Sequence, residues 1–337
     1  MEIAEPAYGS DKAGLVCGYL FRPAVRGEAV ESEQAAAHLA NADRTSEFLW
    51  LHFSLTHAAS LQWLRRHVAL PETFYDSLKE DRSSTRVEVV DGTLLAVVND
   101  VRFFAADVSS PATVTLCVTR RIIVSARTTQ LRAIDRLRSS VRNGETFRSP
   151  AELLAHLLRD QADVLVEIVR DATRRVDAVE DRIIGHQSAS RPELGALRRM
   201  LVRLQRLLAP EPAALFRLMT RPPDWLSEGD VSDLRQSAEE LSAAVSDSAA
   251  LVERIRLLQE ELMALTNEQT NQTLFILTVV TVLALPLTII PGMFGMNVRG
   301  IPFSEAAFGF WVVVLVMTAA VGLAGALAWT RYRRRRF

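Results

Sequence analysis

The chain has 337 residues, 49% of them hydrophobic, and a formal net charge of −1. This length allows one or two soluble domains with real cores, and the ordinary composition excludes a low-complexity or short-repeat protein. The two cysteines, Cys17 and Cys117, fit a reducing compartment and give no indication of a disulfide framework.

The first part of the chain, to about residue 126, contains short runs typical of β-strands with helical stretches among them. Asp91-Gly92 lies between two such runs and predicts a hairpin turn. A helix is expected over Ala58–Val68. We therefore predict a cytoplasmic α/β domain over residues 1–145. The β-rich runs are Leu15–Phe21, Glu47–Phe53, Val87–Val90, Leu94–Val101, Ala112–Val118 and Arg121–Ser125.

Two helix starts follow this domain. Ser149-Pro150-Ala151-Glu152 has Ser as N-cap, Pro in the first turn and Glu positioned for a capping box, so a helix is expected to about Ile184. Ser190-Arg191-Pro192-Glu193 repeats the pattern and predicts a second helix to about Leu208. Breaks are then expected at four prolines, which are Pro210, Pro212, Pro222 and Pro223.

No proline or glycine occurs from Asp230 to Leu285. This stretch predicts one helix of about 60 residues, on the order of 90 Å long. Its first part belongs to a cytoplasmic helical and stalk region over residues 146–269. Such a long helix cannot bury its own surface, which indicates a fibrous or assembled protein.

Two apolar stretches near the C-terminus predict transmembrane helices. Residues 270–298 and 308–330 contain no ionisable side chain, and each stretch is long enough for the roughly 30 Å hydrocarbon core of a bilayer. We assign 270–294 to the first span, 295–307 to an external loop and 308–330 to the second span. The alternative is a buried hydrophobic hairpin, but neither stretch shows the polar stripe of a soluble core helix.

Charge predicts the orientation of these spans. The tail over residues 331–337 contains five arginines directly after the second span, and basic residues beside a span stay in the cytoplasm. Two spans return the chain to its starting side, so both termini are expected to be cytoplasmic. No basic region followed by an apolar core opens the chain, so no signal peptide is expected. The expected location is the inner (plasma) membrane.

Two heptad stripes run along the long helix. One consists largely of small residues, which allow close helix approach. The second carries polar groups into the membrane, where its threonines either bond back to carbonyls one turn earlier or line a water-filled axis between several copies. Towards the cytosol it contains Glu253 and Glu260, which would form acidic rings around such an axis or belong to a solvated surface. The first stripe is Ala243, Ala250, Leu257, Ala264, Asn271, Thr278, Leu285 and Gly292. The second is Glu239, Ser246, Glu253, Glu260, Asn267, Leu274, Thr281 and Thr288.

Gly295-Met296-Asn297, after the proline-containing first span and before a second span and a basic tail, resembles the signature of the CorA superfamily of divalent-cation transporters. The string Phe294–Val298 followed by Gly300-Ile301-Pro302 looks most like its ZntB zinc-transporter branch. The resemblance implies a homopentamer with an αβα cytoplasmic domain, a stalk helix that continues as the pore-lining span, and a peripheral second span. The pore face implied by the family is Asn271, Leu274, Thr278, Thr281, Leu285, Thr288 and Gly292.

The resemblance also places Asn297 at the outer mouth, where five carboxamides would hold a cation through its hydration shell. Glycine allows the backbone to turn there, and Met296 is expected to pack behind the ring. The transported ion would be zinc by resemblance, or magnesium or cobalt in the alternative. Neither span offers the His, Cys or carboxylate that zinc prefers. Arg299 would repel entering metal unless it pairs with Glu305.

Other functions receive less support. His52 and His57 are five residues apart, which on a strand places them on opposite faces and disfavours a shared metal site. A basic run from Arg120 to Arg142 fits ion pairs better than nucleic acid, and no catalytic motif or cofactor site is evident. We expect no enzymatic activity, no cofactor and no nucleic-acid partner; the expected partners are other copies, membrane lipids and divalent cations. The alternative to transport is a membrane-anchored scaffold or sensor with a vestigial pore.

Overall fold

The computed structural model describes residues 9–40, 47–79, 85–101, 111–185, 191–295 and 308–335. The chain divides into two compact units, Met1–Leu258 and Gln259–Phe337, which are described separately. One helix, α8 (Glu228–Phe294), contributes its first half to one unit and its second half to the other.

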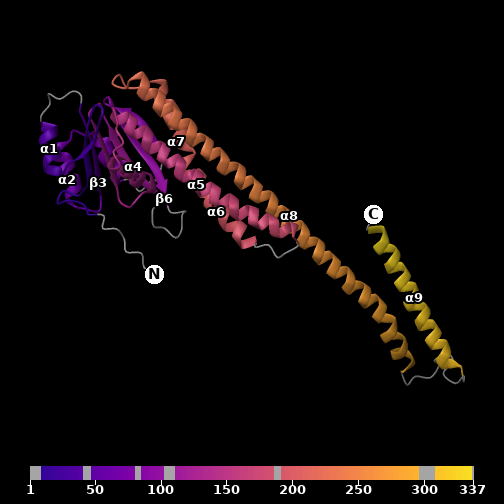
Figure 1. Ribbon diagram of the computed structural model, residues 1–337. Coiled ribbons are helices and arrows are strands. Elements are labelled where there is room, and N and C mark those ends of the chain that lie inside the picture. Colours follow the sequence, from indigo (N-terminus) through magenta and orange to yellow (C-terminus); the bar gives the residue numbers. More distant parts are fainter. Residues whose placement is uncertain are drawn as a thin grey trace. The chain divides into compact units, whose positions relative to one another are not determined.

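A seven-stranded mixed sheet organises the first unit (Figure 1). Its order is β2-β1-β3-β7-β6-β5-β4, with β3 and β7 parallel at the centre and every other neighbouring pair antiparallel. The strands are β1 (Leu15–Arg22), β2 (Val25–Ala29), β3 (Phe48–Ser54), β4 (Arg86–Val90), β5 (Thr93–Val101), β6 (Pro111–Val118) and β7 (Ile122–Arg127).

The predicted strands and the predicted hairpin are present in this sheet. Asp91 and Gly92 have φ of 50° and 74°, the left-handed geometry of a two-residue hairpin turn, and they connect Val90 directly to its partner Thr93. Strand β2 was not predicted. Its sequence, Val-Arg-Gly-Glu-Ala, lacks the apolar alternation of a half-buried strand, because it lies at the sheet edge with mostly exposed side chains.

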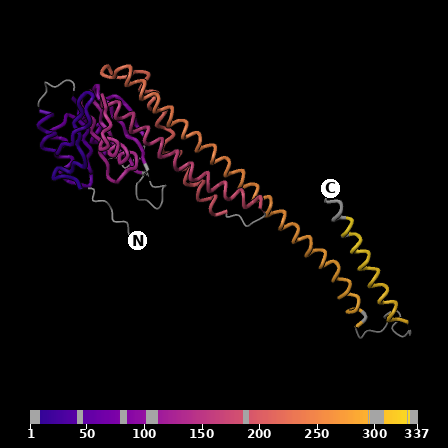
Figure 2. The backbone as a smooth tube through the Cα atoms, in the orientation of Figure 1, coloured from indigo at the N-terminus to yellow at the C-terminus, as the bar shows by residue number. Residues whose placement is uncertain are grey.

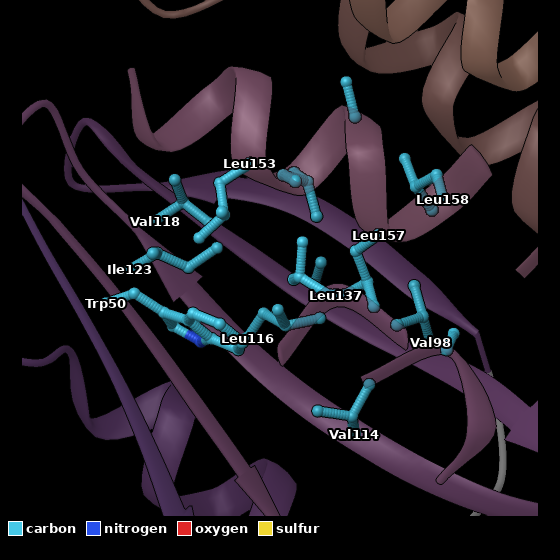
Figure 3. Close-up of a cluster of buried hydrophobic side chains, with 14 of the residues drawn as sticks. Trp50, Val98, Val114, Leu116, Val118, Ile123, Leu137, Leu153, Leu157 and Leu158 are labelled. Atoms are coloured by element: carbon cyan, nitrogen blue, oxygen red, sulfur yellow. The ribbon is translucent and has the colours of Figure 1, made fainter. Parts of the chain in front are cut away.

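Helices cover both faces of the sheet, which confirms the αβα arrangement. Adjacent side chains of strand β3 point to opposite faces of the sheet, so Trp50 contributes to one hydrophobic core and Leu51 to the other. The helices on the face of Leu51 are α1 (Ser32–Ala40), α2 (Ala59–His67) and α3 (Glu72–Lys79). The helices on the face of Trp50 are α4 (Arg132–Arg142), α5 (Pro150–Ile184) and α7 (Pro210–Thr220). Figure 3 shows the second core, where Leu137 of α4 and Leu157 of α5 meet Trp50 and Leu116.

Helix α5 begins and ends where the sequence predicted. The Ser149 hydroxyl accepts a hydrogen bond from the Glu152 amide at 3.0 Å, as an N-cap should. The Glu152 carboxylate accepts from the amide of Arg148, one residue before the cap, at 2.6 Å. The break expected at Pro210 is present, since the preceding helix ends at Leu208. Pro210 also starts α7, and Pro212 lies within the first turn of that helix and does not break it, because proline in a first helical turn loses no internal hydrogen bond.

Three helices of the first unit run side by side (Figures 1 and 2). Ser237 of α8 donates to the Ala155 carbonyl of α5 at 2.9 Å, and Arg254 forms ion pairs with Asp177, at 2.8 Å, and Glu180 of α5. Helix α6 (Arg191–Leu208) joins them through an amide–hydroxyl contact from Gln205 to Ser248, 3.5 Å long. The first half of α8 is therefore packed along one side and exposed along the other.

The second unit consists of the second half of α8 and of α9 (Gly309–Arg335). Both helices are long and apolar enough to cross a membrane. Pro286 and Pro291 lie within α8, and the helix continues through both to Phe294. Helix α9 continues to Arg335, so the first five residues of the predicted basic tail are helical.

Candidate functional site

The predicted pore-facing side chains lie on one face of α8. At about 100° per residue, the seven positions from Asn271 to Gly292 fall within an arc of about 100°. Every one of them is exposed in the single chain; Leu274 and Leu285 are each 54% exposed. The face combines hydroxyl, amide and aliphatic groups and contains no ionisable side chain.

A different face of α8 contacts α9. The half-buried side chains of the second half of α8 form a stripe whose centre lies about 130° from the centre of the predicted pore face. One member of this stripe lies against α9, since a Cβ added at Gly325 of α9 would be in ordinary van der Waals contact with Leu283 of α8, at 4.0 Å. Helix α9 therefore leaves the predicted pore face uncovered. The stripe is Phe275, Val279, Leu283, Pro286 and Ile290.

The three threonines of this face all bond back to α8. Thr278 donates to the Leu274 carbonyl and Thr281 to the Leu277 carbonyl, each at 2.8 Å. Thr288 donates to the Leu285 carbonyl at 3.0 Å. Of the two interpretations of these threonines, the back-bonding one is therefore present. It does not remove the other interpretation, because a hydroxyl that donates to a carbonyl keeps lone pairs with which its oxygen accepts.

The start of the predicted signature lies just after α8. The Gly295 amide donates to the Pro291 carbonyl at 2.8 Å, which closes the last turn of the helix. A Cβ at Gly295 would lie 3.2 Å from that same carbonyl oxygen, so a side chain here would crowd the helix end. Met296, Asn297, Arg299 and Glu305 lie outside the described residues.

The two glutamates predicted to form acidic rings lie on the exposed side of α8. Glu253 forms an ion pair with Arg256, three residues later on the same helix, at 2.7 Å. This pair was not predicted, although the spacing of three residues allows it. Glu260 is exposed as well.

A buried carboxylate that the sequence did not reveal lies in the cytoplasmic unit. Glu211, in the first turn of α7, is 0% exposed. It accepts hydrogen bonds from the Asn99 amide at 2.6 Å and from the Gln161 side chain at 2.7 Å. Burial, with Asp100 nearby, raises the pKa of Glu211 from 4.5 to about 8. In sequence, Glu211 is indistinguishable from an ordinary acidic residue at a helix start.

The two histidines do not form a metal site. His52 is fully buried in β3 with Nδ1 2.7 Å from the Ser125 hydroxyl, whereas His57 follows the strand and accepts from the Ala59 amide. No group of three or more His, Cys, Asp or Glu side chains able to hold a metal occurs among the described residues. The basic run contributes ion pairs, of which Arg136–Glu167 at 2.6 Å is one.

Known proteins share this architecture and sequence. A family model described as "CorA-like Mg2+ transporter protein" matches residues 45–329. The divalent cation transporter CmaX of Pseudomonas aeruginosa is 29% identical over 341 residues, which cover 98% of this chain and 99% of that protein. The zinc transport protein ZntB of Pectobacterium carotovorum is 26% identical over 281 residues, which cover 83% and 85%.

Solved structures give the same result at full length. The structure of full-length CmaX matches with a TM-score of 0.80 at 26% identity, covering 98% of this chain and 100% of that one. The CorA magnesium transporter from Methanocaldococcus jannaschii matches with a TM-score of 0.74 at 18% identity, covering 92% and 96%. The second match concerns the fold alone, and it includes the long helix and both apolar helices.

Proposed function

This chain belongs to the CorA family of divalent cation transporters, and on that premise we propose that five copies assemble into a pore along the uncovered face of α8. As a member of this family, the chain is a membrane protein with two C-terminal transmembrane helices. It is a transporter and not an enzyme. The pentamer, the pore-lining residues and the ion are the proposal.

The uncovered face of α8 supports this arrangement. Helix α9 contacts the opposite side, so a second copy can approach α8 without displacing it. Small residues continue the heptad stripe of Asn271 towards the cytosol, where Ala243, Ala250 and Ala264 are exposed and would allow close approach between helices. A straight helix drifts about 20° per heptad, so this stripe would stay on one face only in a supercoiled assembly. In a pentamer around α8, each of the three threonines would contribute five hydroxyl oxygens to a ring.

The back-bonded threonines carry the mechanistic part of the proposal. Each hydroxyl hydrogen is donated to a carbonyl of its own helix, so the oxygen is left as an acceptor. A hydrated divalent cation presents water hydrogens, which are donors. Rings of acceptor oxygens therefore suit an ion that keeps its water shell, and no carboxylate, imidazole or thiolate is present to replace those waters. Asn297 would form the outermost ring.

Zinc is the first ion to test, because relatives at 26% identity over most of the chain are named zinc transport proteins. A pore for hydrated ions does not select zinc through ligand chemistry, so magnesium and cobalt are expected to pass as well. We place the protein in the inner membrane with both termini in the cytoplasm, since the positively charged residues follow the second span.

The test is uptake into liposomes containing the purified protein. Zinc, magnesium and cobalt are supplied separately, with and without a pH gradient, and metal inside the vesicles is measured. We expect uptake of zinc above that of empty liposomes. Absence of flux for all three ions, from protein that is correctly folded and pentameric, would support the scaffold or sensor function instead.

A further inference from the structure

Helix α6 presents a basic outer face. At about 100° per residue, its arginines fall within an arc of about 140°, whose centre lies about 150° from that of the buried leucine stripe. The arginines are Arg191, Arg198, Arg199, Arg203 and Arg206, and the leucines are Leu194, Leu197, Leu201, Leu204 and Leu208. The helix therefore directs its leucines into the bundle and its arginines away from it.

Three of these arginines have no carboxylate partner among the residues that the structure describes. Arg198, Arg199 and Arg206 are exposed and form no ion pair there. The local composition explains this, since residues 191–221 contain seven arginines but only two acidic residues. One of these acids, Glu193, pairs with Arg182 of α5, and the other, Glu211, is buried. The basic face cannot be neutralised from within its own segment.

The opposite charge is concentrated on α8. Residues 222–268 contain eleven acidic and three basic residues. A stripe at seven-residue spacing runs along the flank of α8 nearest to α5, because one of its members pairs with α5 and another pairs with Arg148, two residues before α5 begins. Asp233 pairs with Arg148, and Arg254 pairs with Asp177. The stripe is Asp233, Glu240, Asp247, Arg254 and Glu261.

Three acidic residues of this stripe are paired neither with α5 nor with Arg148 among the described residues. Glu240, Asp247 and Glu261 are exposed, and within the described parts of the chain none of them forms an ion pair. Glu240 accepts a hydrogen bond from the side-chain amide of Gln236 at 2.9 Å. One protomer thus exposes two surfaces of opposite charge, Arg198, Arg199 and Arg206 on α6 and Glu240, Asp247 and Glu261 on α8, and the described residues include no ion pair between them.

We propose that the basic face of α6 docks onto the acidic stripe of α8 in a neighbouring copy of this chain. The inference rests on the proposed self-assembly and specifies which surfaces meet. A closed ring of identical subunits joins one face of each subunit to a different face of the next, so it needs two unlike, complementary faces. Because the two faces have opposite charges, a second copy of this chain carries the surface that each face would bind. Faces of like charge repel, so the subunits would follow one another head to tail around the ring.

Charge reversal on each side tests this pairing in the full-length protein in detergent. The basic-face variant is Arg199→Glu with Arg206→Glu, and the acidic-stripe variant is Glu240→Arg with Asp247→Arg. A fourth protein combines all four substitutions. The control reverses Arg26 and Arg66, two exposed arginines of the sheet domain. Native mass spectrometry gives the oligomer at a series of protein concentrations, and circular dichroism verifies that each variant is folded.

We expect either double variant to raise the concentration for half-dissociation by at least about tenfold, since attraction becomes repulsion at every interface. The half-dissociation concentration of the combined variant should return to within about threefold of that of the parent. High salt should weaken the assembly of the parent as well, because it screens the attraction between the two faces. If both double variants form pentamers as stable as those of the parent, the proposed docking surfaces are wrong, although the proposed pentamer would still stand. Loss of anionic lipid from unchanged pentamers would assign the arginines to lipid instead. A parent that is monomeric or dimeric would refute the proposed assembly itself.

Discussion

Glu211 is expected to make the stability of the cytoplasmic unit depend on pH. Its pKa is about 8 in the folded protein and 4.5 ordinarily. Because burial favours the protonated acid, folding takes up a proton between these values, and the stabilisation is complete below pH 4.5 and lost as the pH rises through 8. The two values are about 3.5 apart, which corresponds to on the order of 5 kcal/mol over the whole window.

Glu211→Gln should remove this dependence. Between pH 6 and pH 8.5 the parent is expected to lose about 2 to 3 kcal/mol through this group, or about 5 to 10 °C in Tm for a unit of this size. Glutamine at position 211 keeps an oxygen that can accept from the Asn99 amide, but its NH2 group would face the NH2 group of Gln161, so two donors would meet without an acceptor. The variant should therefore be less stable than the parent at pH 6, and its stability should depend less on pH.

Thermal unfolding followed by tryptophan fluorescence, in detergent and at several pH values, measures this effect. Glu239→Gln is the matched control, because Glu239 is an exposed glutamate of α8, and it should retain the slope of the parent. Equal slopes for the parent and for Glu211→Gln would refute the reasoning, since they would mean that Glu211 is ionised in the folded protein.

Three further predictions concern transport through reconstituted protein. Asn297→Ala should abolish divalent flux while native mass spectrometry still shows the parental oligomer; unchanged flux would exclude the proposed ring. Thr281→Val, which keeps the shape but removes the acceptor oxygen, should lower flux several-fold, whereas Thr281→Ser should retain most of it. Glu253→Gln with Glu260→Gln should lower conductance at low ionic strength and have little effect at high salt. Equal conductance at every salt concentration would place both groups on a solvated surface.

The fold was largely predictable because its signals are local. Alternation in β3, the turn at Asp91-Gly92 and the cap at Ser149 each depend on a few neighbouring residues. Strand β2 was missed because an exposed edge strand needs no apolar pattern. The start of α7 at Pro210 was missed because proline breaks one helix and begins another equally well.

The candidate site was predictable only in part. The helical period places the side chains proposed to face the pore on one face of α8 without further information. The position of α9 against Leu283 could not be inferred, because both spans are apolar all round. The environment of Glu211 was also hidden, since Asn99 and Gln161 are distant in sequence and meet it only after the sheet and helices pack.

Accessibility of single cysteines in α8 is the most direct test of the claim that its uncovered face lines a pore. In a background without Cys17 and Cys117, cysteine replaces either Thr281 of the proposed pore face or Val279 of the stripe facing α9, and a small charged thiol reagent is added from the water phase during flux. If the uncovered face lines the pore, modification at position 281 blocks flux while position 279 remains unreactive. Block at position 279 with no effect at position 281 would contradict the claim.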